Sequence, residues 1–326
     1  MRSFLRKRWF LLLLVIAVGF SVLAPAWVRP CVGWFDPQLG VVLSLFLTAW
    51  SLESRSLLAA SLRPLPALWA VAISYGALPA LCWALGGLLP DPELRLGLMI
   101  CASVPCTLAS APVWTRLAGG NDAVALFVVL LTTGTSWLVT TAWLTAATGT
   151  GVSLDPGDMM RGLVLTLVVP VVLGQAGRIP PRLARTAGRW KVATGVAVRL
   201  LVLAIIVKAT VGVGERLTGR TTSLPLGYLV LTAGLCLGVH SAALVGGLAS
   251  SRVLGFDRPS RIAVGFACSQ KTLPVGLYLF DRYFKDDYPL AVVPLLFYHV
   301  GQFVVDTFVA DWLTGRPVAV PDEQAA

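Results

Sequence analysis

A single lysine stands near the middle of an apolar stretch. The stretch covers residues 262–280 and contains CSQKTLPVG, in which Gln270 and Thr272 flank Lys271 and Pro274 follows. A charged side chain at the centre of a bilayer is costly, even on lenient insertion scales. About nine apolar or small residues on each side of Lys271 put both interfaces beyond the reach of its side chain. We interpret Lys271 as a functional cation; the alternative is a structural ion pair with a carboxylate.

Three further polar residues share one helical face. His299, Gln302 and Asp306 are spaced 0, 3 and 7 positions apart, so at 3.6 residues per turn they lie above one another. They are either interhelical hydrogen-bonding groups or a working site. In the second interpretation Asp306 or His299 belongs to a proton path or pairs with Lys271. An intramembrane enzyme using His299 and Asp306 is a remaining alternative, but no GxSxG, HExxH, P-loop or dinucleotide motif supports catalysis.

Composition defines the elements that must position these groups. The 326 residues are 56% hydrophobic and 13% charged, with a mean hydropathy of +0.79, whereas soluble domains are about 25% charged. The pattern predicts an all-α polytopic protein whose main partner is the lipid bilayer. The net charge of +10 is spread over short loops, which argues against nucleic acid as a partner. The six cysteines show no CxxC spacing, so we expect no disulfide framework, metal or cofactor.

Ten apolar segments punctuated by Pro, Gly and charged clusters predict ten transmembrane helices. They cover residues 9–25, 38–52, 65–89, 94–114, 122–147, 159–175, 190–213, 226–250, 260–280 and 288–313. The first resembles a secretory signal, but its apolar run reaches spanning length and the count requires it, so we expect it to be retained.

The distribution of Lys and Arg predicts the orientation. With a cytoplasmic N-terminus, 16 of the 26 basic residues fall on the inner side, seven on the outer side and three inside helices. This bias predicts that both termini are cytoplasmic, in a bacterial inner or plasma membrane. The loop GRIPPRLARTAGRWK is the strongest single anchor.

The helices divide into two sets of five, residues 1–150 and residues 151–326, the latter ending in a short cytoplasmic tail. An odd number of helices per half gives the halves opposite orientations, as in an inverted repeat. The fourth segments of the two halves contain SVPCTLASAPVWT and CSQKTLPVG, which interrupt apolar helices with proline and small polar residues. Matching interruptions indicate the central site of a transporter. The candidate substrate or ion ligands are Thr107, Ser110, Ser269, Gln270, Lys271, Thr272, His299, Gln302 and Asp306.

These motifs, with VVPVVLGQAGR and PLLFYHVGQFVVD, resemble the bile acid:sodium symporter superfamily, specifically its SBF-like branch, over nearly the whole chain. The resemblance implies a panel domain and a core domain, with broken helices four and nine crossing in the core. Sodium-coupled relatives hold two sodium ions near that crossing.

The chain departs from the sodium-coupled pattern at its ion ligands. The acidic position of helix nine is Phe266, the following glutamine is kept as Gln270, and the usual asparagine is Lys271. The polar positions of helices four and five fall at Ala111, Pro112, Ala125 and Val129. We therefore predict a secondary transporter that moves a small organic anion by alternating access without sodium, Lys271 standing in for a bound cation.

Three other interpretations stay open. The first is a membrane regulator that keeps the fold but moves no substrate. The second is a carrier coupled to sodium or protons, and the third is an arsenite-type carrier with thiols at Cys106 and Cys268.

Overall fold

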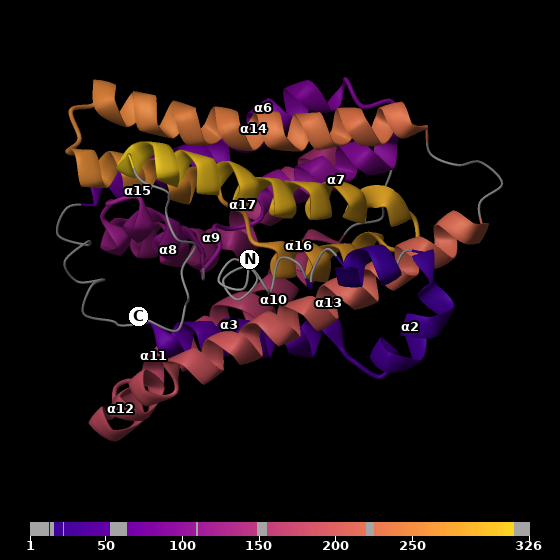
Figure 1. Ribbon diagram of the computed structural model, residues 1–326, viewed down its shortest axis with the longest axis horizontal. Coiled ribbons are helices and arrows are strands. Elements are labelled where there is room, and N and C mark those ends of the chain that lie inside the picture. Colours follow the sequence, from indigo (N-terminus) through magenta and orange to yellow (C-terminus); the bar gives the residue numbers. More distant parts are fainter. Residues whose placement is uncertain are drawn as a thin grey trace.

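Every regular element in the part of the chain that the structure describes is a helix, and that part contains no strand (Figure 1). The computed structural model describes residues 13, 16–21, 23–52, 64–108, 110–148, 155–219 and 225–315. The first half contains α2 (Pro25–Val32), α3 (Pro37–Ser51), α5 (Leu65–Ala72), α6 (Leu78–Gly86), α7 (Pro92–Ser103), α8 (Ser110–Leu117) and α9 (Asp122–Thr148). The second half contains α10 (Pro156–Leu163), α11 (Val169–Ala176), α12 (Pro181–Arg189), α13 (Lys191–Gly219), α14 (Leu226–Val253), α15 (Arg258–Ser269), α16 (Leu273–Leu279) and α17 (Val292–Thr314).

Several of these helices are long and apolar enough to cross a bilayer. Six spans meet that test among the described residues: Leu65–Gly86, Asp122–Thr148, Pro156–Ala176, Lys191–Gly212, Leu226–Val253 and Pro289–Thr314. The pair α2 and α3, bent by 62°, makes a seventh if it counts as one span. The predicted segments 94–114 and 260–280 are each divided into two helices, and most of segment 9–25 lies outside the described residues. The chain is an all-helical, multi-pass membrane protein, and the count of ten spans stays a prediction.

The helices pack in two groups, each of which draws on both halves of the sequence. In one group α3 packs against α11 and α13, and these helices lie along the lower side of Figure 1. In the other group α14 packs against α15 and α17, along the upper side of the same view. The α7 and α9 helices also belong to this second group, through contacts of α7 with α17 and of α9 with α15. Segments far apart in sequence therefore meet around the two interrupted helices.

Prolines determine where carbonyl groups become free inside these spans. A π-helix, Ile73–Ala77, joins α5 to α6, and within it the Leu78 N–H donates to the Ile73 carbonyl, five residues back. Continued in the same register, the next donor would be Pro79, which has no N–H. The Ser74 carbonyl therefore has no helical donor. The Tyr75 carbonyl would be the partner of Pro79 in α-helical register, and the Trp143 indole donates to it instead, at 2.7 Å.

The two interruptions are short extended segments. The first interruption lies between α7 and α8 and begins at Val104. Val104 has a ψ of 156°, which is extended, as expected for a residue that precedes proline. The second interruption comprises Gln270, Lys271 and Thr272, between α15 and α16. Pro274 was expected to break this helix, but it lies in the first turn of α16, where its missing N–H costs nothing. The interruption begins four residues before Pro274, at Gln270.

Close approach of α7 to the segment before α17 requires a glycine. A Cβ atom built on Gly97 would lie 2.2 Å from the carbonyl oxygen of Ala291. No Cβ atom is tolerated at that distance from a backbone atom, so Gly97 allows α7 to pack directly against the start of α17. This contact brings α7, which ends at the first interruption, against the N-terminal end of α17.

Two local features precede the long helices α13 and α9. The basic segment before α13, interpreted from sequence only as a loop that anchors the orientation, contains a helix of nine residues, α12. At the start of α9, Asn121 acts as the N-cap, since its side chain accepts from the Ala123 N–H at 3.1 Å.

Candidate functional site

The ammonium group of Lys271 is fully enclosed and is held by three oxygen atoms. Only 2% of the residue is exposed. Its Nζ lies 2.8 Å from the Ser74 carbonyl, 2.9 Å from the Ser74 hydroxyl and 3.0 Å from the Val104 carbonyl. The ring of Tyr75 lies 5.2 Å from Nζ, which adds a cation–π contact. Each of the three ammonium protons thus has an acceptor.

Both carbonyl acceptors are ones that the helices leave unpaired. Pro79 frees the Ser74 carbonyl, and the Val104 carbonyl lies at the C-terminal end of α7, where the last carbonyls have no helical partner. The partial negative charge of a helix C-terminus adds a favourable field for a cation. The site is therefore a small oxygen cage of the kind that a bound cation occupies, filled by a side chain of the protein.

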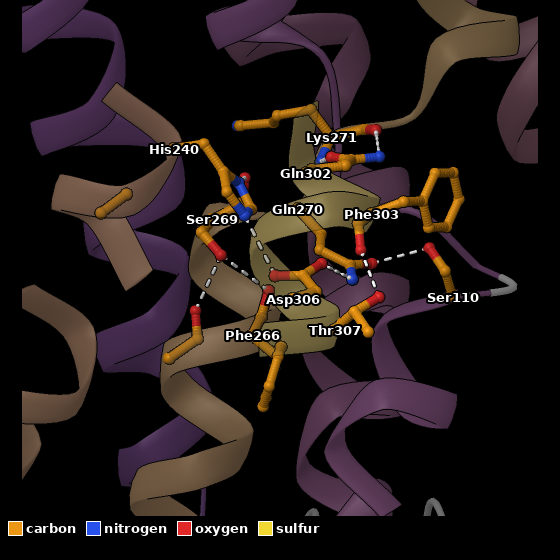
Figure 2. A network of polar contacts seen from close by, with 12 residues as sticks. Ser110, His240, Phe266, Ser269, Gln270, Lys271, Gln302, Phe303, Asp306 and Thr307 are labelled. Carbon is orange, nitrogen blue, oxygen red and sulfur yellow. Dashed lines mark hydrogen bonds and ion pairs between the residues drawn. The ribbon is translucent and has the colours of Figure 1, made fainter. Parts of the chain in front are cut away.

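Gln302 on α17 stabilises the backbone of Lys271. Its Oε1 accepts from the Lys271 N–H at 3.0 Å, and its Nε2 donates to the Lys271 carbonyl at 3.2 Å (Figure 2). Nε2 also lies 3.0 Å from Nδ1 of His299. The amide of Gln302 thus replaces the helical hydrogen bonds that are lost at the interruption.

Asp306 is fully buried and has two partners, neither of which is Lys271. Its Oδ1 lies 3.0 Å from Nε2 of His240 on α14, and its Oδ2 accepts from Nε2 of Gln270 at 2.5 Å. Gln270 in turn accepts a hydrogen bond from the hydroxyl of Ser110 on α8, at 2.7 Å (Figure 2). The interpretation in which Lys271 pairs with Asp306 is wrong, because the face of α17 that carries Asp306 turns toward His240.

The remaining predicted residues lie at the two interruptions, which contact each other directly. The Thr272 N–H donates to the Pro105 carbonyl at 3.1 Å. At the end of α15, the Ser269 carbonyl accepts from the Tyr298 hydroxyl at 2.7 Å. The Ser269 hydroxyl donates to the Gly265 carbonyl within α15. Thr107 is buried in the first interruption. A small cavity of about 10 Å³ lies against Lys271, Thr272, Tyr298 and His299.

Apolar side chains occupy the positions at which sodium-coupled relatives were expected to carry ion ligands. Each of the five side chains is buried and offers no oxygen atom: Ala111, Pro112, Ala125, Val129 and Phe266. Hard cations require several oxygen ligands. Within the described residues, no group of three or more His, Cys, Asp or Glu side chains is arranged to hold a metal ion.

The cysteines proposed for an arsenite-type carrier are both buried. The thiol of Cys268 lies 3.3 Å from the Ala243 carbonyl, and the backbone N–H of Cys106 donates to the Thr132 hydroxyl at 3.2 Å. Both therefore take part in helix packing beside the interruptions, where a buried thiol behaves as a small hydrophobe.

Two partners of the site were missed by the reasoning from sequence. In sequence, Pro79 indicates a free carbonyl four residues earlier, at Tyr75, and the Ser74 carbonyl is freed only because the helix takes π-helical register there. His240 lies on another helix, α14, and nothing in the sequence pairs it with Asp306. Periodicity places residues on a face of their own helix and does not tell which helix covers that face.

Comparison with known proteins agrees with this architecture. The profile of the SBF-like CPA transporter family matches residues 8–314. The chain is 26% identical to sodium/bile acid cotransporter 7 of Danio rerio over 330 residues, which is 95% of this chain and 96% of the relative. It is 26% identical to sodium/bile acid cotransporter 7 of Mus musculus, over 97% of this chain and 96% of the relative.

A plant relative covers less of the chain. The probable sodium/metabolite cotransporter BASS4, chloroplastic, of Oryza sativa subsp. indica is 26% identical over 69% of this chain and 56% of the relative. The family and these relatives are transporters and not enzymes. With a family match over nearly its whole length and a multi-pass helical fold, the chain belongs to the SBF-like CPA transporter family and is a secondary membrane transporter.

Proposed function

We propose that this transporter moves a small organic anion by alternating access and that it does so without sodium. The ammonium of Lys271 takes the place of a bound cation at the contact of the two helix interruptions. The observation that carries the proposal is the oxygen cage around Nζ, formed by both oxygens of Ser74 and the Val104 carbonyl. A cation fixed to the chain fills this cage permanently, so no ion from solution is needed to fill it.

The balance of buried charge favours an anionic substrate. Among the described residues, Lys271 is the only buried Lys or Arg and Asp306 is the only buried carboxylate. Asp306 already has a titratable partner in His240, whereas the three hydrogen-bond partners of the Lys271 ammonium are neutral. An ammonium without a counter-charge attracts an anion strongly in a medium of low dielectric constant. Relatives named for bile acids and metabolites are consistent with an organic substrate.

For the architecture we infer ten helices in two inverted repeats, residues 1–150 and residues 151–326. The packing group of α3, α11 and α13 would be the panel, and the group of α7, α9, α14, α15 and α17 would be the core. The hydrogen bond between Thr272 and Pro105 supports a crossing of the interrupted helices. Such interruptions survive in a bilayer only where polar groups satisfy the freed backbone, as Lys271 and Gln302 do here.

The proposed orientation makes a prediction of its own. If both termini are cytoplasmic, a reporter fused after Ala326 must be active on the cytoplasmic side. A reporter inserted between Asp155 and Asp158, before α10, must then be active on the opposite side. The same side for both reporters contradicts the inverted repeat, because it requires an even number of spans between these sites.

Ligand-induced stabilisation tests the function directly. Detergent-purified protein is heated with a panel of small carboxylates and with cholate, in sodium buffer and in choline buffer. We expect at least one anion to raise the melting temperature equally in both buffers, since a ligand at 100 times its Kd stabilises by about 2.7 kcal/mol. That anion is then followed as a radiolabel into liposomes that contain the protein.

The alternatives give different results in the same assays. Stabilisation that requires sodium contradicts the role of Lys271 as a replacement for the cation and indicates a sodium-coupled carrier. Binding without uptake contradicts transport and indicates a regulator on the same fold.

A further inference from the structure

The pair formed by His240 and Asp306 is the most enclosed titratable pair among the described residues. Both side chains have no solvent exposure, and Nε2 lies 3.0 Å from Oδ1. The pair joins α14 to α17, and Figure 2 shows it directly beside Gln270 at the second interruption. The proposed role of Lys271 does not use this pair.

The hydrogen bonds of His240 determine where its protons are. Its Nδ1 lies 3.2 Å from the Ser269 carbonyl, which can only accept, so Nδ1 must carry a hydrogen. Its Nε2 faces a carboxylate oxygen, and at 3.0 Å one proton must lie between them. That proton belongs either to an imidazolium beside a carboxylate or to a carboxylic acid beside a neutral imidazole. In both cases the pair holds one shared proton and has no net charge.

Loss of the shared proton changes the charge of the whole core. The pair then carries one negative charge, and two lone pairs face each other across the Nε2–Oδ1 contact. The only other charged side chain buried in the described residues is Lys271, with one positive charge. The core therefore carries a net charge of +1 when the pair is protonated and zero when it is not. An anion is attracted to the first state and not to the second.

We propose that His240 and Asp306 form the proton-binding site of this transporter and that one proton moves together with each anion. The inference rests on the proposed function, because it names the coupling ion of the same site. Binding is reciprocal: if the proton raises the affinity for the anion, the anion raises the affinity for the proton by the same factor.

Gln270 connects the proton site to the interrupted helices. Its Nε2 donates to Oδ2 of Asp306, and its Oε1 accepts from Ser110 on α8. Gln270 also precedes Lys271 in the second interruption. A change of charge on Asp306 therefore acts on hydrogen bonds that reach both interruptions, which are the segments that alternating access must rearrange.

The surroundings supply no second carboxylate that would take over this role. Among the buried side chains of the described residues, Asp306 is the only carboxylate. The other buried titratable side chains on the elements packed around the pair are Tyr75, Cys82, Cys101, Cys106, Cys236, Cys268, Lys271, Tyr278, Tyr298 and His299. Tyr228, Arg252, Arg258, Arg261 and Asp311 lie on the same helices at positions that are not buried.

The composition of the chain makes the proton site observable without any substrate. The protein contains two histidines, His240 and His299, so protein labelled with ¹⁵N-histidine gives signals from two rings only. The His299→Gln variant assigns them. We expect Nδ1 of His240 to stay protonated throughout a titration from acid to alkaline pH, while the Nε2 signal moves as the shared proton leaves. In Asp306→Asn this movement should be lost.

Two results of the titration overturn the inference. A His240 ring whose signals do not move over the whole pH range in which the protein is folded binds no exchangeable proton. Movement that is the same in wild type and Asp306→Asn shows that the two residues do not share the proton. The wild-type titration decides the first point even if the variant does not fold.

A second measurement tests the coupling and separates it from the proposed function. The anion found by thermal screening is added to weakly buffered protein with a pH-sensitive dye. We expect uptake of up to one proton per bound anion in wild type and none in Asp306→Asn. Asp122→Asn is the matched control, because Asp122 is a partly exposed partner of Arg116 and should behave as wild type. Binding without proton uptake overturns the inference and leaves the proposed function standing. If no anion binds, the proposed function fails and the histidine titration alone decides whether the proton site exists.

Discussion

Replacing Lys271 with methionine is expected to stop transport in both sodium and choline buffers. Methionine keeps most of the volume of the side chain but removes the charge, so the Ser74 and Val104 oxygens lose their donor. A buried acceptor left without a partner costs about 1–3 kcal/mol. The substrate anion also loses its counter-charge. Uptake into liposomes by wild type and variant measures the loss, with a thermal melt to show that the variant is folded.

The Lys271→Ala variant separates the roles proposed for the ammonium. Alanine leaves a void lined by the three oxygen atoms that held Nζ, and sodium can enter a void of that chemistry. If Lys271 replaces a bound cation, Lys271→Ala should be inactive in choline and regain part of its transport in sodium. If Lys271 only contacts the substrate, the variant should show a raised KM with kcat little changed in either buffer.

A second lysine provides the matched control. Lys208 on α13 also donates to backbone carbonyls, those of Gly33 and Phe35, but it lies in the other packing group. Lys208→Met should therefore keep its transport. Full transport by Lys271→Met contradicts the role given to the buried ammonium.

The burial of Lys271 could be predicted from the sequence, but its partners could not. A lysine in the middle of a long apolar run has no route to water, so its enclosure follows from local sequence alone. Its acceptors lie 197 and 167 positions away in the chain, at Ser74 and Val104. Contacts at such separations depend on how whole helices pack, and no local pattern specifies this.

Helix boundaries show the same division between local and tertiary causes. The apolar runs of α9, α13 and α14 were predicted within a few residues, because their length and hydropathy are local properties. The exact position of the second interruption was not. Pro274 is compatible with the first turn of a helix, and the extended residues before it are held open by Gln302 from α17. The sequence around an interruption therefore indicates that one exists, while the packing partner decides where it lies.

The sequence predicted correctly that three polar residues share one face of α17, but the pairing of Asp306 with Lys271 was wrong. His299, Gln302 and Asp306 do lie on one buried face. The three residues have different partners: Gln302 binds the backbone of Lys271, and Asp306 binds His240. Spacing at 3.6 residues per turn stacks these side chains at successive heights, and each height meets a different element.

Replacing Gln302 with leucine is expected to destabilise the protein more than any comparable change of a glutamine outside the site. The variant removes the acceptor for the Lys271 N–H and the donor to the Lys271 carbonyl in one step. Both backbone groups are buried, and each unsatisfied group costs about 1–3 kcal/mol, so we expect a loss of about 2–6 kcal/mol. Thermal unfolding in detergent, monitored by circular dichroism, measures the effect.

Three further variants separate the causes of that loss. Gln175→Leu removes another amide that bonds backbone carbonyls between helices, those of Ala49 and Leu52, away from the interruptions. It should cost less, because interhelical hydrogen bonds in bilayers average about 0.6 kcal/mol. His299→Leu removes the contact of Gln302 with the imidazole and the edge-on contact of that ring with Phe303, but leaves both bonds of Gln302 to the Lys271 backbone, so it should be milder than Gln302→Leu. Gln302→Glu keeps an acceptor for the Lys271 N–H and should fall between wild type and leucine. Equal melting temperatures for Gln302→Leu and Gln175→Leu would show that the interruption is held by other contacts, and the oxygen cage around Lys271 would then have to be stable without support from α17.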